Sequence, residues 1–266
     1  MSKRKKVRRS TNFGKYTKKK SKKKPEHDVI KDPKASILIS LYQADDYIDE
    51  FLERLTHQSY LKNSECIFLI NEDDIGDVTK KVKNFPFEKQ VVEIQEVENL
   101  YTSWNRGIDL ARGEYLINMN VDDYHMMSLL ETHILALDSN PEFGLVYGIC
   151  RYTNEAFSKA QVVHFNNISY SKVMNYVVEK NQRIVGCCPM WRKSLHEKYG
   201  KFDDETYKGA ADHDMWIRLM LGGEKFGFID ALSSIQFLHK DTLTSRVNPN
   251  HCENEILRKK YGDDVM

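Results

Sequence analysis

The sequence has no long apolar run and little cysteine. No stretch reaches the roughly 18 consecutive apolar residues that a membrane-spanning helix needs, and the first residues lack the apolar middle of a secretory signal. The 266 residues include five cysteines, an odd number with no Cys-x-x-Cys pair. These absences argue against a membrane-spanning protein and against a small disulfide-framed one. We therefore expect a cytoplasmic location.

Acidic residues are missing from the start of the chain. Residues 1–24 contain 13 Lys and Arg and no acid, whereas the remainder has 27 basic and 39 acidic residues. Because this segment has few sizeable apolar side chains, we expect residues 1–34 to form a disordered basic tail. Residues 1–24 can attract a polyanion, such as nucleic acid, anionic lipid or an acidic partner. A solvated extension without a partner is the alternative.

Short apolar runs alternate with amphipathic segments along the rest of the chain. This order predicts an α/β fold with largely parallel strands. The expected strands are 36–40, 66–70, 91–94, 115–120 and 145–150, with closing strands at 225–229 and 235–238. The expected helices are one that follows Asp45 as its N-cap and reaches Leu55, two over 100–111 and 126–137, and one that begins at Asp212.

Polar side chains follow the strand expected at 115–120. Asn120, Asp122 and Asp123 come directly after an apolar run, and ligands of open α/β folds bind where parallel strands end. Mg²⁺ and Mn²⁺ take one or two carboxylates and complete their coordination with water and phosphate oxygens. The pattern thus predicts a metal and nucleotide site, and the alternative is that the two aspartates cap a following helix.

Three segments resemble family 2 glycosyltransferases. They are residues 36–59, residues 99–148 with the region of the family's DxD motif, and residues 186–218, which contain Gly-Lys-Phe-Asp and Ala-Asp-His-Asp. The resemblance covers about residues 35–245 and implies a GT-A fold, a single Rossmann-like mixed sheet flanked by helices. It divides that domain into a nucleotide-binding half, 35–150, and an acceptor half, 151–245. Residues 246–266 would be a C-terminal tail.

The resemblance also implies a set of donor-binding and metal-binding residues. The metal ion, Mn²⁺ or Mg²⁺, would be held by Asp122, Asp123 and the late His239. Asn120 stands where the family has its first Asp, which makes the motif Asn-x-Asp-Asp. Tyr42 would stack on the nucleotide base. The further donor contacts implied are Leu41, Asn71, Glu72, Asp73, Asn105 and Asn120, with Trp191 offering a face to a sugar ring, whereas Trp104 and Trp216 are expected to pack in the core.

Asp212 matches the aspartate of the family's ED motif, with Ala211 in place of the preceding acid. The resemblance implies that Asp212 is the catalytic base. A carboxylate can take the proton from a sugar hydroxyl as its oxygen attacks the anomeric carbon, and inversion would result. A helix N-cap is the structural alternative for Asp212. Asp214 and Arg218, four residues apart on one helix, are expected to form a salt bridge.

The sequence thus predicts an inverting, metal-dependent hexosyltransferase-type enzyme. It would move a sugar from a UDP- or GDP-sugar donor to the hydroxyl of a carbohydrate or another acceptor. The alternative is an inactive GT-A-like binding module whose basic tail binds nucleic acid or an anionic surface, a hypothesis favoured by Asn120 and Ala211. A nucleotidyltransferase is disfavoured, because no glycine-rich phosphate loop follows the first expected strand.

Overall fold

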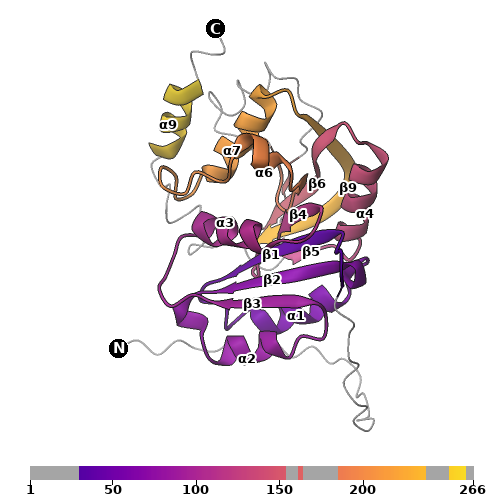
Figure 1. Cartoon of the computed structure of the whole chain (residues 1–266), viewed down its shortest axis with the longest axis vertical. Coiled ribbons are helices and arrows are strands. Elements are labelled where there is room, and N and C mark those ends of the chain that lie inside the picture. Colours follow the sequence, from indigo (N-terminus) through magenta and orange to yellow (C-terminus); the bar gives the residue numbers. More distant parts are fainter. Residues whose placement is uncertain (1–29, 154–160, 164–184, 238–251, 262–266) are drawn as a thin grey trace.

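The computed structural model describes residues 30–153, 161–163, 185–237 and 252–261, so most of the expected basic tail lies outside the described residues. A mixed sheet of nine strands in the order β3-β2-β1-β4-β8-β6-β9-β5, with β7 paired to β6, forms the centre (Figure 1). The strands are β1 (Ala35–Leu41), β2 (Ser64–Ile70), β3 (Lys89–Glu93), β4 (Tyr115–Asn118), β5 (Tyr124–His125), β6 (Phe143–Thr153), β7 (Gln161–Val163), β8 (Met190–Arg192) and β9 (Lys225–Phe237).

Four parallel strands, β3, β2, β1 and β4, make up one half of the sheet. β1 pairs with β2 from Ala35 opposite Ser64 to Leu41 opposite Ile70. The two strands read as nearly continuous apolar runs because they are covered on both faces. Since the four strands run in the same direction, their carboxyl ends meet at one edge of the sheet.

Helices cover both faces and create two cores. The helices are α1 (Ile48–Thr56), α2 (Asp77–Lys83), α3 (Leu100–Leu110), α4 (Leu129–Ser139), α6 (Leu195–Tyr199), α7 (Ala211–Leu221) and α9 (Cys252–Tyr261), with short 3₁₀ turns η1 (Leu61–Asn63) and η2 (Glu72–Asp74). On β1, Ile37 and Ile39 belong to the core that also contains side chains of α1, α2 and α4, whereas Leu38 belongs to the core with side chains of α3, α7 and α9. Because successive side chains of a strand point to opposite faces of the sheet, β1 contributes side chains to both cores.

The parallel direction expected for the first five strands is confirmed, but with an insertion. β8 lies antiparallel between β4 and β6, which therefore run in the same direction. β6 in turn pairs in parallel with β9. The two closing strands expected at 225–229 and 235–238 form the single strand β9, whose pairing with β6 shifts register at irregular points.

Two expected helix starts are wrong. The helix expected at 126–137 begins at Leu129, because Tyr124 and His125 form β5 and the N–H of Met126 donates to the carbonyl of Ser233 at 2.9 Å. The first helix begins at Ile48, and Asp45 does not cap it. Its first turn is instead closed by backbone bonds to the carbonyl of Ala44. A tertiary contact thus sets the start of α4, whereas a local backbone turn sets the start of α1.

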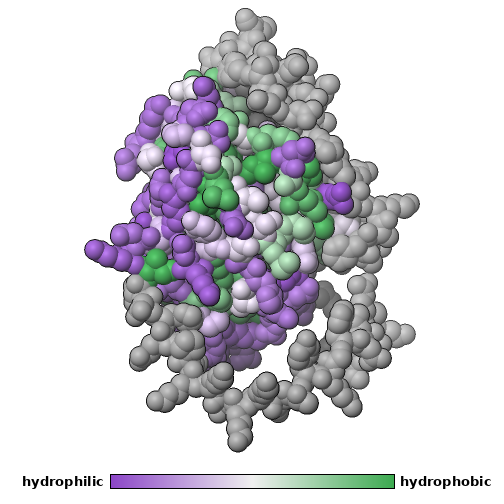
Figure 2. Space-filling model, turned by 90° about the vertical axis from the view of Figure 1, so that its right-hand side faces the viewer, coloured by the Kyte–Doolittle hydropathy of each residue, from purple (hydrophilic) through white to green (hydrophobic). Residues whose placement is uncertain are grey.

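The surface is predominantly hydrophilic, with local apolar areas. Figure 2 shows apolar side chains gathered in the upper half of one face, with hydrophilic side chains to their left and below. Among the described residues, Tyr124 is 37% exposed, Leu135 50% and Met127 63%. Exposed apolar side chains are ordinary on the surface of a folded domain.

Candidate active site

The ends of β1 and β2 are joined by a buried amide. Asn71 is 1% exposed, its Nδ2 donates to the carbonyl of Leu41 at 3.1 Å, and its Oδ1 accepts from the N–H of Glu98 at 2.9 Å. The side chain of Leu41 is fully buried in the core. Asn71 and Leu41 were both expected to contact the donor. Their side chains instead lie beneath this edge of the sheet, where Asn71 binds the backbone and Leu41 packs in the core.

Three other expected donor contacts lie on the surface of the same edge. Tyr42 is 42% exposed, and Glu72 and Asp73 are exposed on η2. The acid that the sequence analysis missed is Asp74. It is 3% exposed, and its two carboxylate oxygens accept from the N–H of Ala44 at 2.9 and 3.2 Å. Burial raises the pKa of Asp74. Its place in the run Glu72-Asp73-Asp74 was visible in the sequence, but its burial was not.

The turn after β4 separates the two aspartates of the expected metal site. Asp123 is 1% exposed, and its carboxylate accepts from Asn120 Nδ2 at 3.1 Å and from the N–H of Phe237 at 3.2 Å. Burial, together with the charge of Asp122, raises the pKa of Asp123 well above its usual range. Asp122 is only half-buried. The alternative of a helix cap is wrong, because the strand β5 follows this turn.

Asp123 therefore ties the end of β4 to the end of β9, while Asp122 is the more accessible carboxylate. Within the described ranges, no group of three or more His, Cys, Asp or Glu side chains is placed to surround a metal ion, and His239 lies outside the described residues. A divalent ion bound mainly through diphosphate oxygens and water needs only one or two protein carboxylates. Asp122 fits that mode, and an all-protein cage does not fit.

Asp212 lies in the first turn of α7. The N-cap residue is Ala210, so the alternative of Asp212 as N-cap is wrong. Tyr101 Oη donates to Asp212 Oδ1 at 2.8 Å, and Tyr101 belongs to the first turn of α3, which Asn99 caps through the N–H groups of Tyr101 and Thr102. α3 follows β3, and the N–H of Glu98 is bound by Asn71. The start of α3 thus brings Asp212 to the edge where β1 and β2 end.

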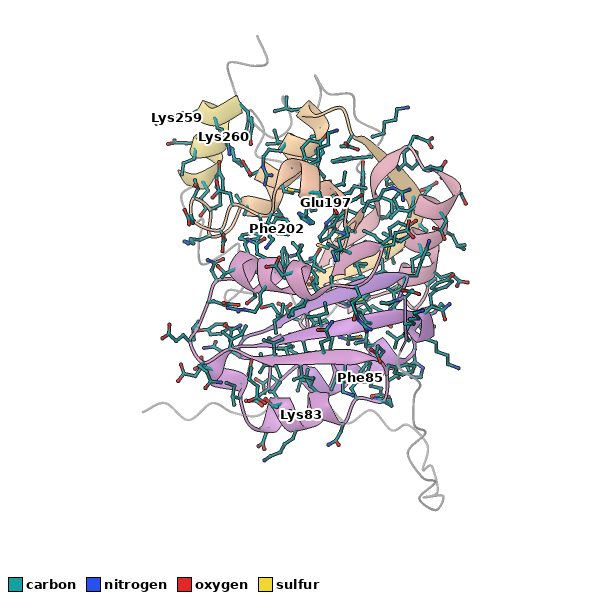
Figure 3. The ribbon with its side chains drawn as sticks, viewed as in Figure 1. Lys83, Phe85, Glu197, Phe202, Lys259 and Lys260 are labelled. Atoms are coloured by element: carbon teal, nitrogen blue, oxygen red, sulfur yellow. The ribbon has the colours of Figure 1, made fainter. Side chains whose placement is uncertain are left out.

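Two expected donor contacts are corrected by their packing. Asn105 Nδ2 donates to the carbonyl of Phe202 at 2.8 Å and its Oδ1 accepts from the N–H of Phe202 at 3.1 Å, so the amide holds a loop. Trp191 is fully buried, its ring centroid lies 5.4 Å from that of Trp216, and its indole N–H donates to His196. A side chain without exposed surface cannot face a sugar. Figure 3 shows Phe202 between α3 and the helices above it.

Other expected contacts of this region are confirmed. Trp104 is 5% and Trp216 3% exposed, so both pack in the core. Arg218 Nε lies 2.8 Å from Asp214 Oδ2, which is the expected salt bridge. A small pocket elsewhere contains none of the expected site residues and is lined by Phe51, Arg54, Leu55, Gln58, Met119 and His125.

Comparison with protein families identifies the chain. The model of glycosyl transferase family 2 matches residues 36–200. The chain belongs to glycosyl transferase family 2. This family 2 glycosyltransferase is 21% identical over 220 residues to an uncharacterised glycosyltransferase of Methanocaldococcus jannaschii, covering 81% of this chain and 74% of the relative. An uncharacterised glycosyltransferase of Haemophilus influenzae is 23% identical over 251 residues, covering 88% and 73%.

Solved structures show that the family 2 glycosyltransferase has the GT-A fold. The crystal structure of S. aureus TarS 1-349 in complex with UDP-GlcNAc matches with a TM-score of 0.65 at 15% identity, over 80% of this chain and 61% of that one. Mannosyltransferase PcManGT from Pyrobaculum calidifontis, in complex with GDP-Man and Mn²⁺, matches with a TM-score of 0.59 at 16% identity, over 84% and 63%. The chain thus spans about three fifths of these structures. In the described part of the chain, no helix is long and apolar enough to cross a membrane.

Proposed function

We propose that this family 2 glycosyltransferase transfers a sugar from a UDP- or GDP-sugar to a hydroxyl acceptor, with inversion and with a divalent ion, Mn²⁺ or Mg²⁺. The observation that carries the proposal is the bond between Tyr101 and Asp212, which holds a half-buried carboxylate at the edge of the sheet. The structural neighbours with UDP-GlcNAc and with GDP-Man and Mn²⁺ support these classes of donor and ion.

Asp212 is the general base of the proposed reaction. Tyr101 engages one of its oxygens and so orients the carboxylate. Asp212 accepts the proton of the acceptor hydroxyl while the hydroxyl oxygen bonds to the anomeric carbon. The bond from that carbon to the phosphate oxygen breaks at the opposite face, and the nucleoside diphosphate leaves with the bonding electrons. One displacement of this kind inverts the anomeric configuration.

Asp122 is the proposed ligand of the divalent ion, and Asp123 positions the turn that carries it. When bound, the ion supplies positive charge beside the diphosphate. In the Asn-x-Asp-Asp motif, Asn120 donates to Asp123 rather than adding a further negative charge. This arrangement favours the variant motif as a working form of the site, because a third acid here would repel the buried carboxylate.

The donor is proposed to lie over the surface-facing residues of the same edge. Tyr42 is exposed enough for its ring to stack on a nucleotide base, and Glu72 and Asp73 are accessible beside it. We keep residues 35–150 as the nucleotide-binding half and 151–245 as the acceptor half. His239 remains a proposed metal ligand, and the acceptor remains a carbohydrate or another hydroxyl compound.

Donor hydrolysis and transfer test this proposal. The unaltered chain is incubated with a panel of nucleotide sugars and Mn²⁺, and the released nucleoside diphosphate is measured. Asp122→Ala and Asp212→Ala should each abolish release, since one removes the ion's ligand and the other the base. Asp230→Asn, a change of an exposed acid on β9, is the control. NMR of the product should show an inverted anomeric centre.

The outcomes separate the proposal from its alternative. If Asp212→Ala still releases the nucleoside diphosphate, Asp212 is not the general base. No release from any donor by the unaltered chain would instead favour the inactive binding module.

A further inference from the structure

The last helix, α9, packs on the element that carries Asp212. Leu257 is 1% exposed and Tyr261 5%, and both belong to the core cluster that contains Met215 and Trp216 of α7. Figure 1 shows α9 beside the loop that leads into α7. The expected C-terminal tail, residues 246–266, therefore contains a helix that is part of the folded domain.

One end of α9 fixes the backbone just before α7. Glu253 is 6% exposed, and its two carboxylate oxygens accept from the N–H groups of Lys208 at 2.8 Å and Gly209 at 2.9 Å. The next residue, Ala210, is the N-cap of α7. A buried carboxylate that accepts hydrogen bonds from two backbone N–H groups is a strong and directional anchor. Because Glu253 is almost fully buried, we assign it no contact with a substrate.

The other end of α9 fixes the first turn of α7. Lys260 Nζ and Tyr261 Oη each donate to Asp214 Oδ1 at 2.7 Å, and Arg218 donates to Oδ2 of the same carboxylate. Asp214 is fully buried and stands two residues after Asp212. Figure 3 shows Lys260 on α9. The helix therefore contacts the chain on both sides of Asp212.

α3 holds the same loop from the opposite direction. Thr102 Oγ1 donates to Asp204 Oδ2 at 2.6 Å, and Lys208 Nζ donates to the carbonyl of Asp204. The loop over residues 202–210 is thus fixed by α3 at its start and by Glu253 at its end. The position of α7 along its axis depends on the second contact, because residues 208 and 209 lead directly into the helix.

We propose that α9 is a brace that sets the position of the Asp212 carboxylate, with Glu253 as the positioning residue. The inference rests on the proposed function of Asp212 as general base. Replacing the Glu253 carboxylate with an amide leaves one accepting oxygen and sets an NH₂ group against the second backbone N–H, so residue 208 or 209 loses its acceptor and the start of α7 can move. A displacement of about 1 Å at a reacting group can cost on the order of a hundredfold in rate.

Glu253→Gln tests the brace in the full chain, with Glu255→Gln as the matched control on the exposed side of the same helix. We expect Glu253→Gln to lower kcat about tenfold, to change the KM of the nucleotide sugar less than twofold, and to leave the chain folded by circular dichroism. The donor KM stays because the proposed donor contacts lie at the ends of β1 and β2. Glu255→Gln should match the unaltered chain.

Hydrogen exchange gives a second readout that does not depend on turnover. Amides of residues 207–216 should exchange faster in Glu253→Gln than in Glu255→Gln, while those of β1 and β2 should not change. Unchanged exchange at 207–216, or a kcat equal to that of the unaltered chain, would overturn the brace. The brace would also be overturned if the decrease in kcat were fully explained by a smaller fraction of folded protein.

Tyr261→Phe serves if Glu253→Gln does not fold. It removes one of the donors to Asp214, and it should accelerate exchange at 207–216 and lower kcat by a smaller factor, about threefold. Failure of the proposed function looks different. The unaltered chain would then transfer no sugar, or Asp212→Ala would remain active, while the exchange experiment would still decide whether α9 holds the start of α7.

Discussion

Two histidines, His125 and His133, are buried, and burial favours their neutral form. His133 is fully buried on α4 and His125 is 5% exposed on β5. Burial lowers the pKa of His133 to about 4 and, together with the charge of Arg54, that of His125 to about 3. The unfolded chain binds a proton at these residues near pH 6.5. Both histidines therefore contribute stability above that pH, which is lost progressively as the pH falls.

We predict that the free energy of unfolding decreases between pH 6.5 and pH 4 by about 1.4 kcal/mol per pH unit for each histidine. His133→Leu should reduce this slope, and His57→Gln, a change of an exposed histidine, should leave it unchanged. Urea denaturation at a series of pH values measures the slope. An equal slope in the unaltered chain and His133→Leu would contradict the assignment.

Some residue roles could be predicted from the sequence and others could not. The Asp214–Arg218 pair follows from spacing alone and is confirmed, whereas the roles of Asp122 and Asp212, which the family resemblance implies, stay proposals. Tyr101 could not be found in this way, because it lies 111 positions before the carboxylate that it binds. Trp191 was misplaced for a related reason. Its surroundings in the sequence do not show that the rings of His196, Phe202 and Trp216 pack against it.

At the scale of elements, the contact between β1 and the start of β4 is unusually close. A Cβ added to Gly113 would lie 2.5 Å from the backbone nitrogen of Ser36 and 2.6 Å from the carbonyl carbon of Ala35. The N–H of Gly113 also donates to Ser36 Oγ at 2.8 Å. Glycine is needed here because backbone atoms cannot move aside as a flexible side chain can.

We predict that Gly113→Ala lowers the free energy of unfolding by about 1–3 kcal/mol, as overpacking of a rigid contact does. The control is Gly107→Ala, where the added Cβ would meet the end of the Leu38 side chain at 2.9 Å and the change should cost less. Chemical denaturation monitored by fluorescence compares the two variants. The prediction fails if Gly113→Ala is as stable as the unaltered chain.

Elements with a clear local pattern were predictable. β1, β2 and β4 are apolar runs, and α3 and α7 have apolar side chains at helical spacing. α2 was not expected, and it has only seven residues. β5 has two residues, and it exists because β9 offers it a partner. Short elements of this kind depend on a neighbour that is distant in the sequence, so local pattern does not reveal them.

At the scale of the molecule, charge divides the chain into a basic start and an acidic remainder. We predict that removal of residues 2–24 leaves sugar transfer to a small acceptor unchanged, because no proposed site residue lies in that segment. Binding to single-stranded DNA and to anionic vesicles should weaken and lose its salt dependence. Titrations at two salt concentrations measure this. If the shortened chain loses sugar transfer to the same extent as it loses polyanion binding, the segment serves the catalytic domain and the prediction is wrong.

The place of β8 in the sheet has a consequence for how this enzyme can be divided. β8 lies in the segment proposed as the acceptor half, yet it pairs with β4 on one side and with β6 on the other. A fragment that stops at residue 150 would lack β8, so the backbone groups of β4 and β6 that pair with it would have no partner in the sheet. The proposed nucleotide-binding and acceptor halves are therefore not interchangeable modules, and a hybrid of two relatives must take β4, β8 and β6 from the same parent.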